Sequence, residues 1–232
     1  MYKKVLIKLS GESLMDGLEN VSKEKTLKIA KLIKKVKKLG ISVGIVIGGG
    51  NFFRGRSNKD MEPIFVDTMG MLGTTINALG LADAFTKEDV PFIISIPFDL
   101  NGLVPKYTTE EILDKYQDNV VIFGGGTGHI GCSTDTCASN KASLIKADAI
   151  IKLTNVDGVY DMDPNKYDDA KMYDNLTHRE VLENKEIKVM DIDAIKECMD
   201  NNIDILVINF NDEENLIRVL QGNKIGTKIS SK

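Results

Sequence analysis

Short apolar runs alternate with longer amphipathic segments along this chain. Six runs rich in branched aliphatic residues are typical of strands buried on both faces, and they span residues 5–9, 41–47, 92–96, 120–123, 149–153 and 205–209. Apolar residues at helical spacing predict helices over residues 23–39, 62–87, 108–116, 134–146, 191–202 and 213–221. This alternation predicts an α/β fold, a three-layer αβα sandwich around a largely parallel central sheet.

The longest predicted helix, residues 62–87, contains Gly70, Gly73 and Gly80. Each glycine should weaken a helix by about 1 kcal/mol relative to alanine. Glycines make sense here if another backbone packs closely against the helix, or if a partner helix crosses it. The segment is therefore a candidate dimer face.

The 232-residue chain is 42% hydrophobic, which is enough to form one large domain or two fused lobes. No linker interrupts it, so we expect a single domain over residues 1–232, with approximate lobes at 1–150 and 151–232. The net charge is −4 and aromatic residues make up 6%. We expect no nucleic-acid partner, because displacing counterions from a phosphate backbone requires a basic surface.

The cysteines, Cys132, Cys137 and Cys198, and the two histidines supply neither a disulfide framework nor a zinc site. We assign no residue as a metal ligand. The first apolar run stops at Lys8, which is too short for a signal peptide, and no stretch approaches membrane-spanning length. The sequence predicts a soluble, cytoplasmic protein without a membrane partner.

Three predicted strands end in turns that are rich in glycine. These turns cover residues 8–11, 48–55 and 124–128. Glycine lets backbone N–H groups approach a phosphate closely, and Lys8 and Arg54 add positive charge at two of the turns. Since ligands gather at the carboxyl ends of parallel strands, the three turns together predict a phosphate-binding crevice suited to phosphoryl transfer.

Two other phosphate-binding motifs fit poorly. A GxxxxGK[ST] loop is absent from the sequence. Residues 126–131 match GxGxxG, but a dinucleotide site also needs an acidic residue at the end of the following strand. Here Asp148 precedes that strand, and Asp157 lies beyond its end. Residues 157–164 read as a turn or hairpin that is either a solvated excursion or a flap over a ligand.

Several motifs, in order, make the chain resemble the bacterial UMP kinases of the amino-acid-kinase superfamily. They are KLSGE at 8–12, VIGGGNFFRG at 46–55, DTMGMLGT at 67–74, the Thr127-Gly128 and Ser133-Thr134-Asp135 pair, TNVDGVYDMDP at 154–164 and KVMD at 188–191. The resemblance runs from Lys4 to about Lys228. It implies the amino-acid-kinase fold and transfer of the γ-phosphoryl group of ATP to UMP in pyrimidine nucleotide synthesis.

The resemblance also implies roles for individual residues. The ATP site would comprise Lys8, Leu9, Ser10, Gly11, Gly50, Arg54, Thr154, Asn155, Tyr160 and Asp163. The UMP site would comprise Gly49, Asp67, Thr127, Gly128, His129, Ile130, Gly131, Cys132, Ser133 and Thr134. The catalytic set would be Lys8, Arg54, Asp135 and Asp191, although both aspartates also suit a helix-capping or surface role.

Further expectations concern the cofactor and the assembly. Mg²⁺ would bind through the ATP phosphates, and the resemblance implies a homohexamer built as a trimer of dimers. The lobe of residues 1–150 would hold UMP and the dimer contacts, and the lobe of residues 151–232 would hold ATP.

The sequence departs from the family in the acceptor loop. Members carry Asn-Pro-Phe-Phe or a close variant there, whereas this chain has His129, Ile130, Gly131 and Cys132. Backbone contacts to UMP do not depend on side chains, but the aromatic packing of this loop is lost. The segment 14–20 is also shorter than in members for which GTP activation is described.

Two alternatives remain open at this point. The first is a related kinase that acts on carbamate, N-acetylglutamate or aspartate. Such an enzyme would offer its acceptor an arginine rather than Asp67. The second is a nucleotide sensor without turnover. The altered acceptor loop suggests it, and it is opposed by the retained Lys8, Arg54, Asp135 and Asp191.

Overall fold

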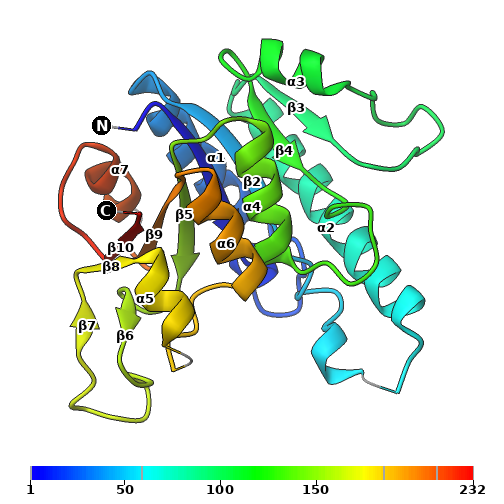
Figure 1. Cartoon of the computed structure of the whole chain (residues 1–232). Coiled ribbons are helices and arrows are strands. Elements are labelled where there is room, and N and C mark those ends of the chain that lie inside the picture. Colours follow the sequence, from blue (N-terminus) through cyan, green and yellow to red (C-terminus); the bar gives the residue numbers. More distant parts are fainter. Residues whose placement is uncertain (1, 59, 185, 213, 232) are drawn as a thin grey trace.

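The computed structural model describes residues 2–58, 60–184, 186–212 and 214–231. Within these residues eight strands form one sheet in the order β3-β4-β2-β1-β5-β9-β10-β8 (Figure 1). The strands are β1 (Lys4–Leu9), β2 (Ser42–Ile47), β3 (Phe92–Ser95), β4 (Val120–Phe123), β5 (Ala149–Thr154), β8 (Asn175–Thr177), β9 (Asp204–Asn209) and β10 (Thr227–Ser230). Neighbouring strands are parallel except for the antiparallel pair β9 and β10, which confirms the largely parallel sheet.

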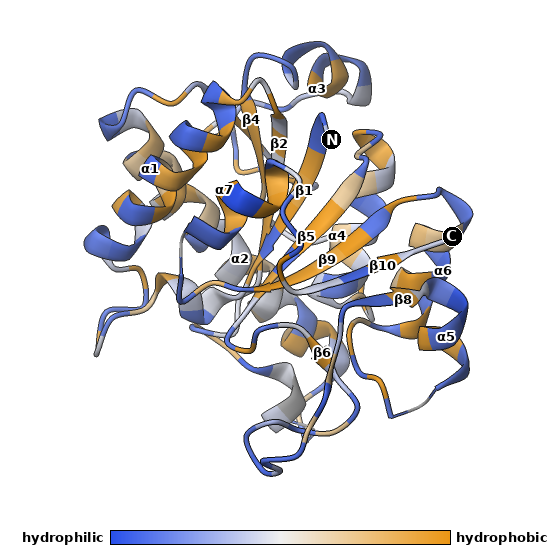
Figure 2. Cartoon of the chain, turned by 90° about the vertical axis from the view of Figure 1, so that its left-hand side faces the viewer, coloured by the Kyte–Doolittle hydropathy of each residue, from blue (hydrophilic) through white to orange (hydrophobic). Residues whose placement is uncertain are grey.

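Helices cover both faces of this sheet. One layer holds α1 (Lys23–Lys38), α2 (Pro63–Lys87) and α7 (Glu214–Leu220), and the other holds α3 (Thr109–Lys115), α4 (Thr134–Leu144), α5 (His178–Glu183) and α6 (Ile192–Asp200). Figure 2 shows α1 and α7 on one side of the sheet and α5 and α6 on the other. The three-layer αβα sandwich is confirmed. Residue 213, the predicted start of the last helix, lies outside the described residues, as do residues 1 and 232.

The alternation of side chains along β1 shows how the sequence builds two cores. Val5, Ile7 and Leu9 are buried against the layer of α1 and α2, whereas Leu6 is buried in the cluster beneath α4 and α6. Successive residues of a strand point to opposite faces, so a strand that is apolar throughout serves both layers. The run of residues 5–9 is therefore central to the sheet.

Strand register places the ends of the parallel strands at a common edge. Lys8 pairs with Val46 of β2 on one side and with Lys152 of β5 on the other. Val46 pairs in turn with Phe123 of β4. Because these strands run in the same direction, the three glycine-rich turns leave the sheet side by side.

The segment after β5 forms the predicted hairpin. In it β6 (Val159–Tyr160) pairs antiparallel with β7 (Met172–Tyr173) in a small sheet of its own. Figure 1 shows this hairpin beyond the end of the sheet toward which β5 points.

Helix α2 corrects one expectation from the sequence. Its 25 residues are long and apolar enough to cross a membrane by length and composition alone, with a mean hydropathy of 1.3 over the best window. Core helices pass the same test, and Ala78, Leu81 and Phe85 on one side of α2 are indeed fully buried in the sheet core. The opposite side of the helix is exposed and apolar.

The glycines of α2 permit close approach by other parts of this chain. A Cβ atom added at Gly73 would lie 3.3 Å from the carbonyl oxygen of Gly49, and one added at Gly80 would lie 2.4 Å from Cγ1 of Val21. The first of the two explanations for these glycines, close packing by another backbone, thus holds for Gly73. At Gly70 the space is open.

Candidate active site

A cavity of about 630 Å³ opens at the common edge of β1, β2 and β4. Its walls come from all three glycine-rich turns, from the first turn of α4 and from the face of α2 that carries Asp67. The predicted crevice is therefore present, with turns that are distant in sequence brought to one place. A cavity of this size is in the range of small-molecule sites.

Lys8 and Asp135, which line the cavity, form a charged cluster with Lys152 of β5. Nζ of Lys8 lies 2.6 Å from Oδ1 of Asp135, and Nζ of Lys152 lies 3.4 Å from the same oxygen. The lysine of β5 also donates a hydrogen bond to the carbonyl oxygen of Val189. The three charged side chains are between 14% and 18% exposed, so little solvent screens their charges.

The cluster shifts the pKa values of its members. Burial alone would raise the pKa of Asp135, but the adjacent charges of Lys8 and Lys152 outweigh it and hold the pKa below its ordinary value. Burial, the largest cause, and repulsion from the Lys8 charge, the second, lower the pKa of Lys152 to about 8. The negative charge of Asp135 opposes that change. Lys152 thus loses its proton at a lower pH than an ordinary lysine does.

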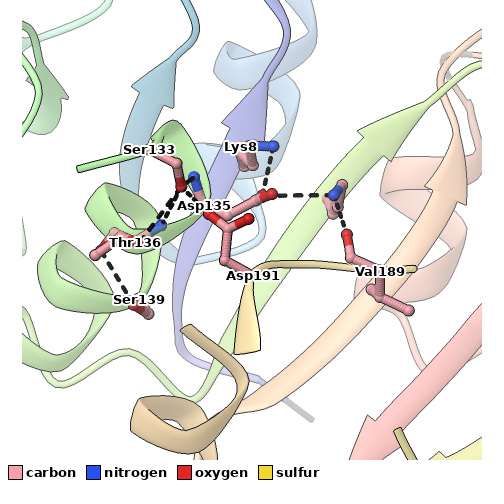
Figure 3. Close-up of polar contacts among 8 residues, drawn as sticks. Lys8, Ser133, Asp135, Thr136, Ser139, Val189 and Asp191 are labelled. Atoms are coloured by element: carbon pink, nitrogen blue, oxygen red, sulfur yellow. Dashed lines mark hydrogen bonds and ion pairs between the residues drawn. The ribbon is translucent and has the colours of Figure 1, made fainter. Parts of the chain in front are cut away.

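Asp191 reaches this cluster through a hydroxyl group. It occupies the N-cap position of α6, but its side chain makes no capping hydrogen bond there. Instead its Oδ2 accepts a hydrogen bond from the hydroxyl group of Ser133, the N-cap of α4 (Figure 3). The same hydroxyl oxygen accepts hydrogen bonds of 3.1 Å from the backbone N–H groups of Asp135 and Thr136. Neither Asp135 nor Asp191 therefore uses its side chain for the helix-capping role that the sequence also allowed. Asp135 pairs with lysines, and Asp191 is bound to the start of α4.

Arg54 lies at the rim of the cavity. Its Nη2 donates to Oε1 of Glu12 at 2.6 Å, and its side chain is 64% exposed. A Cβ atom added at Gly50 would lie 2.8 Å from the same Glu12 oxygen. This carboxylate therefore connects the first two glycine-rich turns and holds the guanidinium group at the cavity mouth.

The predicted acceptor loop lies opposite Asp67. The carboxylate of Asp67 accepts a hydrogen bond of 2.6 Å from the backbone N–H of Gly131. Gly131 adopts a φ of 81°, a conformation that glycine tolerates and the phenylalanine of the family pattern would not favour. The loop is thus held by a backbone hydrogen bond at the point where the sequence departs from the family pattern described above.

The cavity collects only part of the predicted residues. From the UMP set it is lined by Gly49, Asp67, Thr127, His129, Gly131, Cys132, Ser133 and Thr134, and from the remaining sets by Lys8, Leu9, Ser10, Gly11, Gly50, Arg54 and Asp135. Gly128 and Ile130 are not part of its wall. Gly128 packs against Pro97, and Ile130 is exposed.

The predicted nucleoside residues of the ATP site lie outside this cavity. Thr154 ends β5 and donates a hydrogen bond of 2.7 Å to the carbonyl oxygen of Val156. Tyr160 lies on β6, and the exposed Asp163 accepts a hydrogen bond of 3.0 Å from the N–H of Asn165. These residues lie at the carboxyl end of β5, the strand that carries Lys152, and in the hairpin that follows it.

Lys152 is not among the site residues predicted from the sequence, because residues 149–153 have the pattern of an ordinary buried strand. A lysine inside such a strand is itself a signal, because lysine is rarely buried unless it is paired or functional. Glu12 was also missed, although it belongs to the first quoted motif.

Comparison with known proteins agrees with this fold. The model of the amino acid kinase family matches residues 3–209, and this chain belongs to that family. Over 234 residues it is 40% identical to a uridylate kinase of Thermosipho melanesiensis, with the whole of both chains covered.

Two solved structures extend the likeness to three dimensions. A UMP kinase from Bacillus anthracis superposes with a TM-score of 0.94 at 34% identity, covering 100% of this chain and 97% of the other. A UMP kinase from Ureaplasma parvum superposes with a TM-score of 0.91 at 34% identity, covering 99% of each chain.

Proposed function

We propose that this chain is a UMP kinase, which transfers the γ-phosphoryl group of ATP to UMP and yields UDP and ADP. The observation that carries the proposal is the shared pairing of Lys8 and Lys152 with Asp135 where the glycine-rich turns meet. The likeness to uridylate kinases over the full chain supports the choice of acceptor.

The residues of the cluster match the demands of phosphoryl transfer. The reaction needs positioning and neutralisation of charge more than covalent chemistry by the protein. Lys8 and Lys152 place two ammonium groups beside the carboxylate of Asp135, where they can neutralise charge on the transferring phosphoryl group. The acceptor oxygen of UMP is already anionic, so the reaction requires no general base.

Donor and acceptor are proposed to enter from two sides. The turn at Lys8, Leu9, Ser10 and Gly11, with Gly50 and Arg54, would hold the phosphates of ATP, and Thr154, Asn155, Tyr160 and Asp163 would hold its nucleoside. Gly49 and the loop from Thr127 to Thr134 would hold UMP, with Asp67 accepting hydrogen bonds from the ribose hydroxyls. In this proposal the nucleoside residues of the ATP site belong to the lobe of residues 151–232, whereas its phosphate-binding residues and the UMP site belong to the lobe of residues 1–150.

Magnesium is proposed to arrive bound to the ATP phosphates. The carboxylate of Asp191 lies close enough to Lys152 to influence its pKa and is bound to Ser133, so its position fits an ion held mainly by phosphate oxygens. When bound, the ion would neutralise phosphate charge. Asp135 keeps its own role, which is to orient the two lysines.

We also propose that two chains associate through α2. Phe65, Met69, Leu72, Ile76 and Leu79 are between 41% and 60% exposed, and they recur at alternating spacings of four and three residues. That spacing places them along one apolar stripe, the pattern of a helix that packs against another helix. A trimer of such dimers would give the homohexamer. The free cysteines suit a reducing cytoplasm.

An assay of ADP formation with several acceptors tests the proposed activity. Purified protein, ATP and Mg²⁺ would be combined in turn with UMP, CMP, carbamate, N-acetylglutamate and aspartate. We expect turnover with UMP well above that with every other acceptor. Turnover with one of the acids would instead assign the chain to another acceptor class, and tight UMP binding without ADP formation would identify a sensor.

A further inference from the structure

Two buried asparagine side chains face each other behind the glycine-rich turns. Nδ2 of Asn51 donates to Oδ1 of Asn77, and Nδ2 of Asn77 donates to Oδ1 of Asn51, both at 2.8 Å. Asn77, on α2, is fully buried, and Asn51, in the turn after β2, is 8% exposed. We call this reciprocal contact the amide pair.

The second N–H of each amide group binds a backbone carbonyl. Asn77 donates to the carbonyl oxygen of Gly48, and Asn51 donates to that of Asn20, again at 2.8 Å in both cases. Each side-chain amide therefore uses both of its N–H groups. A buried polar network that is fully satisfied is rigid, and it favours one arrangement of the segments it joins.

The amide pair also lies against the first glycine-rich turn. A Cβ atom added at Gly11 would lie only 2.2 Å from Oδ1 of Asn51 and 2.8 Å from the carbonyl oxygen of Gly48. The backbone N–H of Gly48 donates to the carbonyl oxygen of Leu9 at 2.9 Å. The turn after β1 thus packs on Asn51, the turn after β2 is bonded to Asn77, and Gly11 leaves no room for a side chain between them.

We propose that Asn51 and Asn77 are positioning residues that set the distance and orientation between the two phosphate-binding turns. The proposal rests on the proposed function, in which the turn at Gly11 would hold the donor phosphates and the turn of residues 48–55 would contact UMP at Gly49 and ATP at Gly50 and Arg54. Neither asparagine need touch a nucleotide. Loss of the pair would leave both turns present but misaligned, and displacement by about 1 Å is enough to slow a transfer reaction about 100-fold.

Three variants test this role. Asn77→Leu keeps the approximate size of the side chain and removes all of its hydrogen bonds. Asn51→Ala breaks the same pair from the loop side, outside helix α2. Thr75→Val is the matched control, because this buried threonine of α2 donates only to Met71 of its own helix among the contacts described for it.

The readouts separate positioning from folding. Turnover would be measured with saturating ATP and acceptor, the dissociation constants of both nucleotides by calorimetry, and the midpoint of thermal unfolding alongside. We expect kcat to fall between about 10-fold and 100-fold in both asparagine variants, with each dissociation constant within about threefold of wild type. The threonine variant should keep the wild-type kcat.

Two outcomes would overturn the proposal. One is a kcat within about twofold of wild type in a folded Asn51→Ala or Asn77→Leu protein. The other is an equal loss of nucleotide affinity and kcat in all three variants, which would indicate general disruption of α2. If Asn77→Leu does not fold, Asn51→Ala decides alone. If the wild-type protein phosphorylates another acceptor instead of UMP, the proposed function fails. The kcat values of the three variants, measured with that acceptor, still test the amide pair.

Discussion

Nζ of Lys8, near the end of the first strand, lies 2.6 Å from Oδ1 of Asp135, in the first turn of α4. The same oxygen receives Lys152 from the neighbouring strand at 3.4 Å. Two ammonium groups, each less than a fifth exposed, thus share one carboxylate at the cavity that the glycine-rich turns line. The predictions below follow from this arrangement and from the surfaces around it.

The pKa of Lys152, lowered to about 8, predicts an alkaline limb in the pH profile. As the pH rises through that value, Lys152 loses its proton in the free enzyme and with it the charge that attracts ATP. We therefore expect kcat/KM for ATP to fall above about pH 8. Lys152→Arg, which remains charged throughout this range, should lose that limb even if its rate is lower. An identical limb in both proteins would exclude Lys152 as its source.

Replacement of Asp135 should affect both stability and turnover. Asp135→Asn leaves Lys8 and Lys152 buried without their counter-charge, which should cost about 3–5 kcal/mol of unfolding free energy and lower kcat at least 10-fold. Because the folded pKa of Asp135 lies below its ordinary value, the stability it contributes is present at neutral pH and is lost as the pH falls through that lowered pKa.

Chemical denaturation of the Asp135 variant at neutral pH measures the effect. Asp193→Asn is the control, since Asp193 forms an exposed ion pair with Lys196 on α6 and should matter little. A variant of Asp135 as stable and as active as this control would contradict the role assigned to the cluster.

Asp67→Asn should weaken UMP binding much more than ATP binding. Asparagine can still accept the hydrogen bond from Gly131, so the acceptor loop should keep its place while the charged acceptor for the ribose hydroxyls is lost. Calorimetric titration with each nucleotide should show a loss of about 10-fold or more for UMP and little change for ATP. Equal losses for both nucleotides would reject the ribose assignment.

The exposed stripe of α2 predicts a dimer that a charge should break. Ile76→Asp would bury a carboxylate in an apolar interface, which is strongly unfavourable without a partner charge. Light scattering coupled to gel filtration should show wild type as a dimer or larger assembly and the variant as a monomer. Leu103→Asp, at an apolar residue that is 84% exposed in the loop between β3 and α3, should leave the assembly intact. A variant of Ile76 with the wild-type mass would place the interface elsewhere.

The sequence predicted the parts of the fold that have strong periodicity. The six predicted strands and the six predicted helices are present within a few residues of their expected bounds, apart from residue 213, which lies outside the described residues. Strands β8 and β10 and helix α5 were missed, because they are short and their few buried residues do not form a recognisable repeat. Their place is fixed by tertiary packing at the edge of the sheet.

The parts of the site that need a glycine-rich backbone were predictable from the sequence. The parts that depend on contacts between side chains distant in the sequence were not. Glycine-rich turns after parallel strands predicted the crevice directly. The pairing of Lys152 with Asp135 depends on the register of β1 with β5 and on the start of α4, which no local pattern reveals. The contact between Ser133 and Asp191 is of the same kind.

Transfer of labelled phosphate tests the central claim most directly. Protein would be mixed with ATP carrying ³²P at the γ position, UMP and Mg²⁺, and the products separated by chromatography. We expect the label in UDP with wild type, and a rate of transfer lower by at least about 100-fold with Lys8→Ala although both nucleotides still bind. Label in UDP at an unchanged rate with Lys8→Ala, or label that remains in ATP with wild type, would contradict the account.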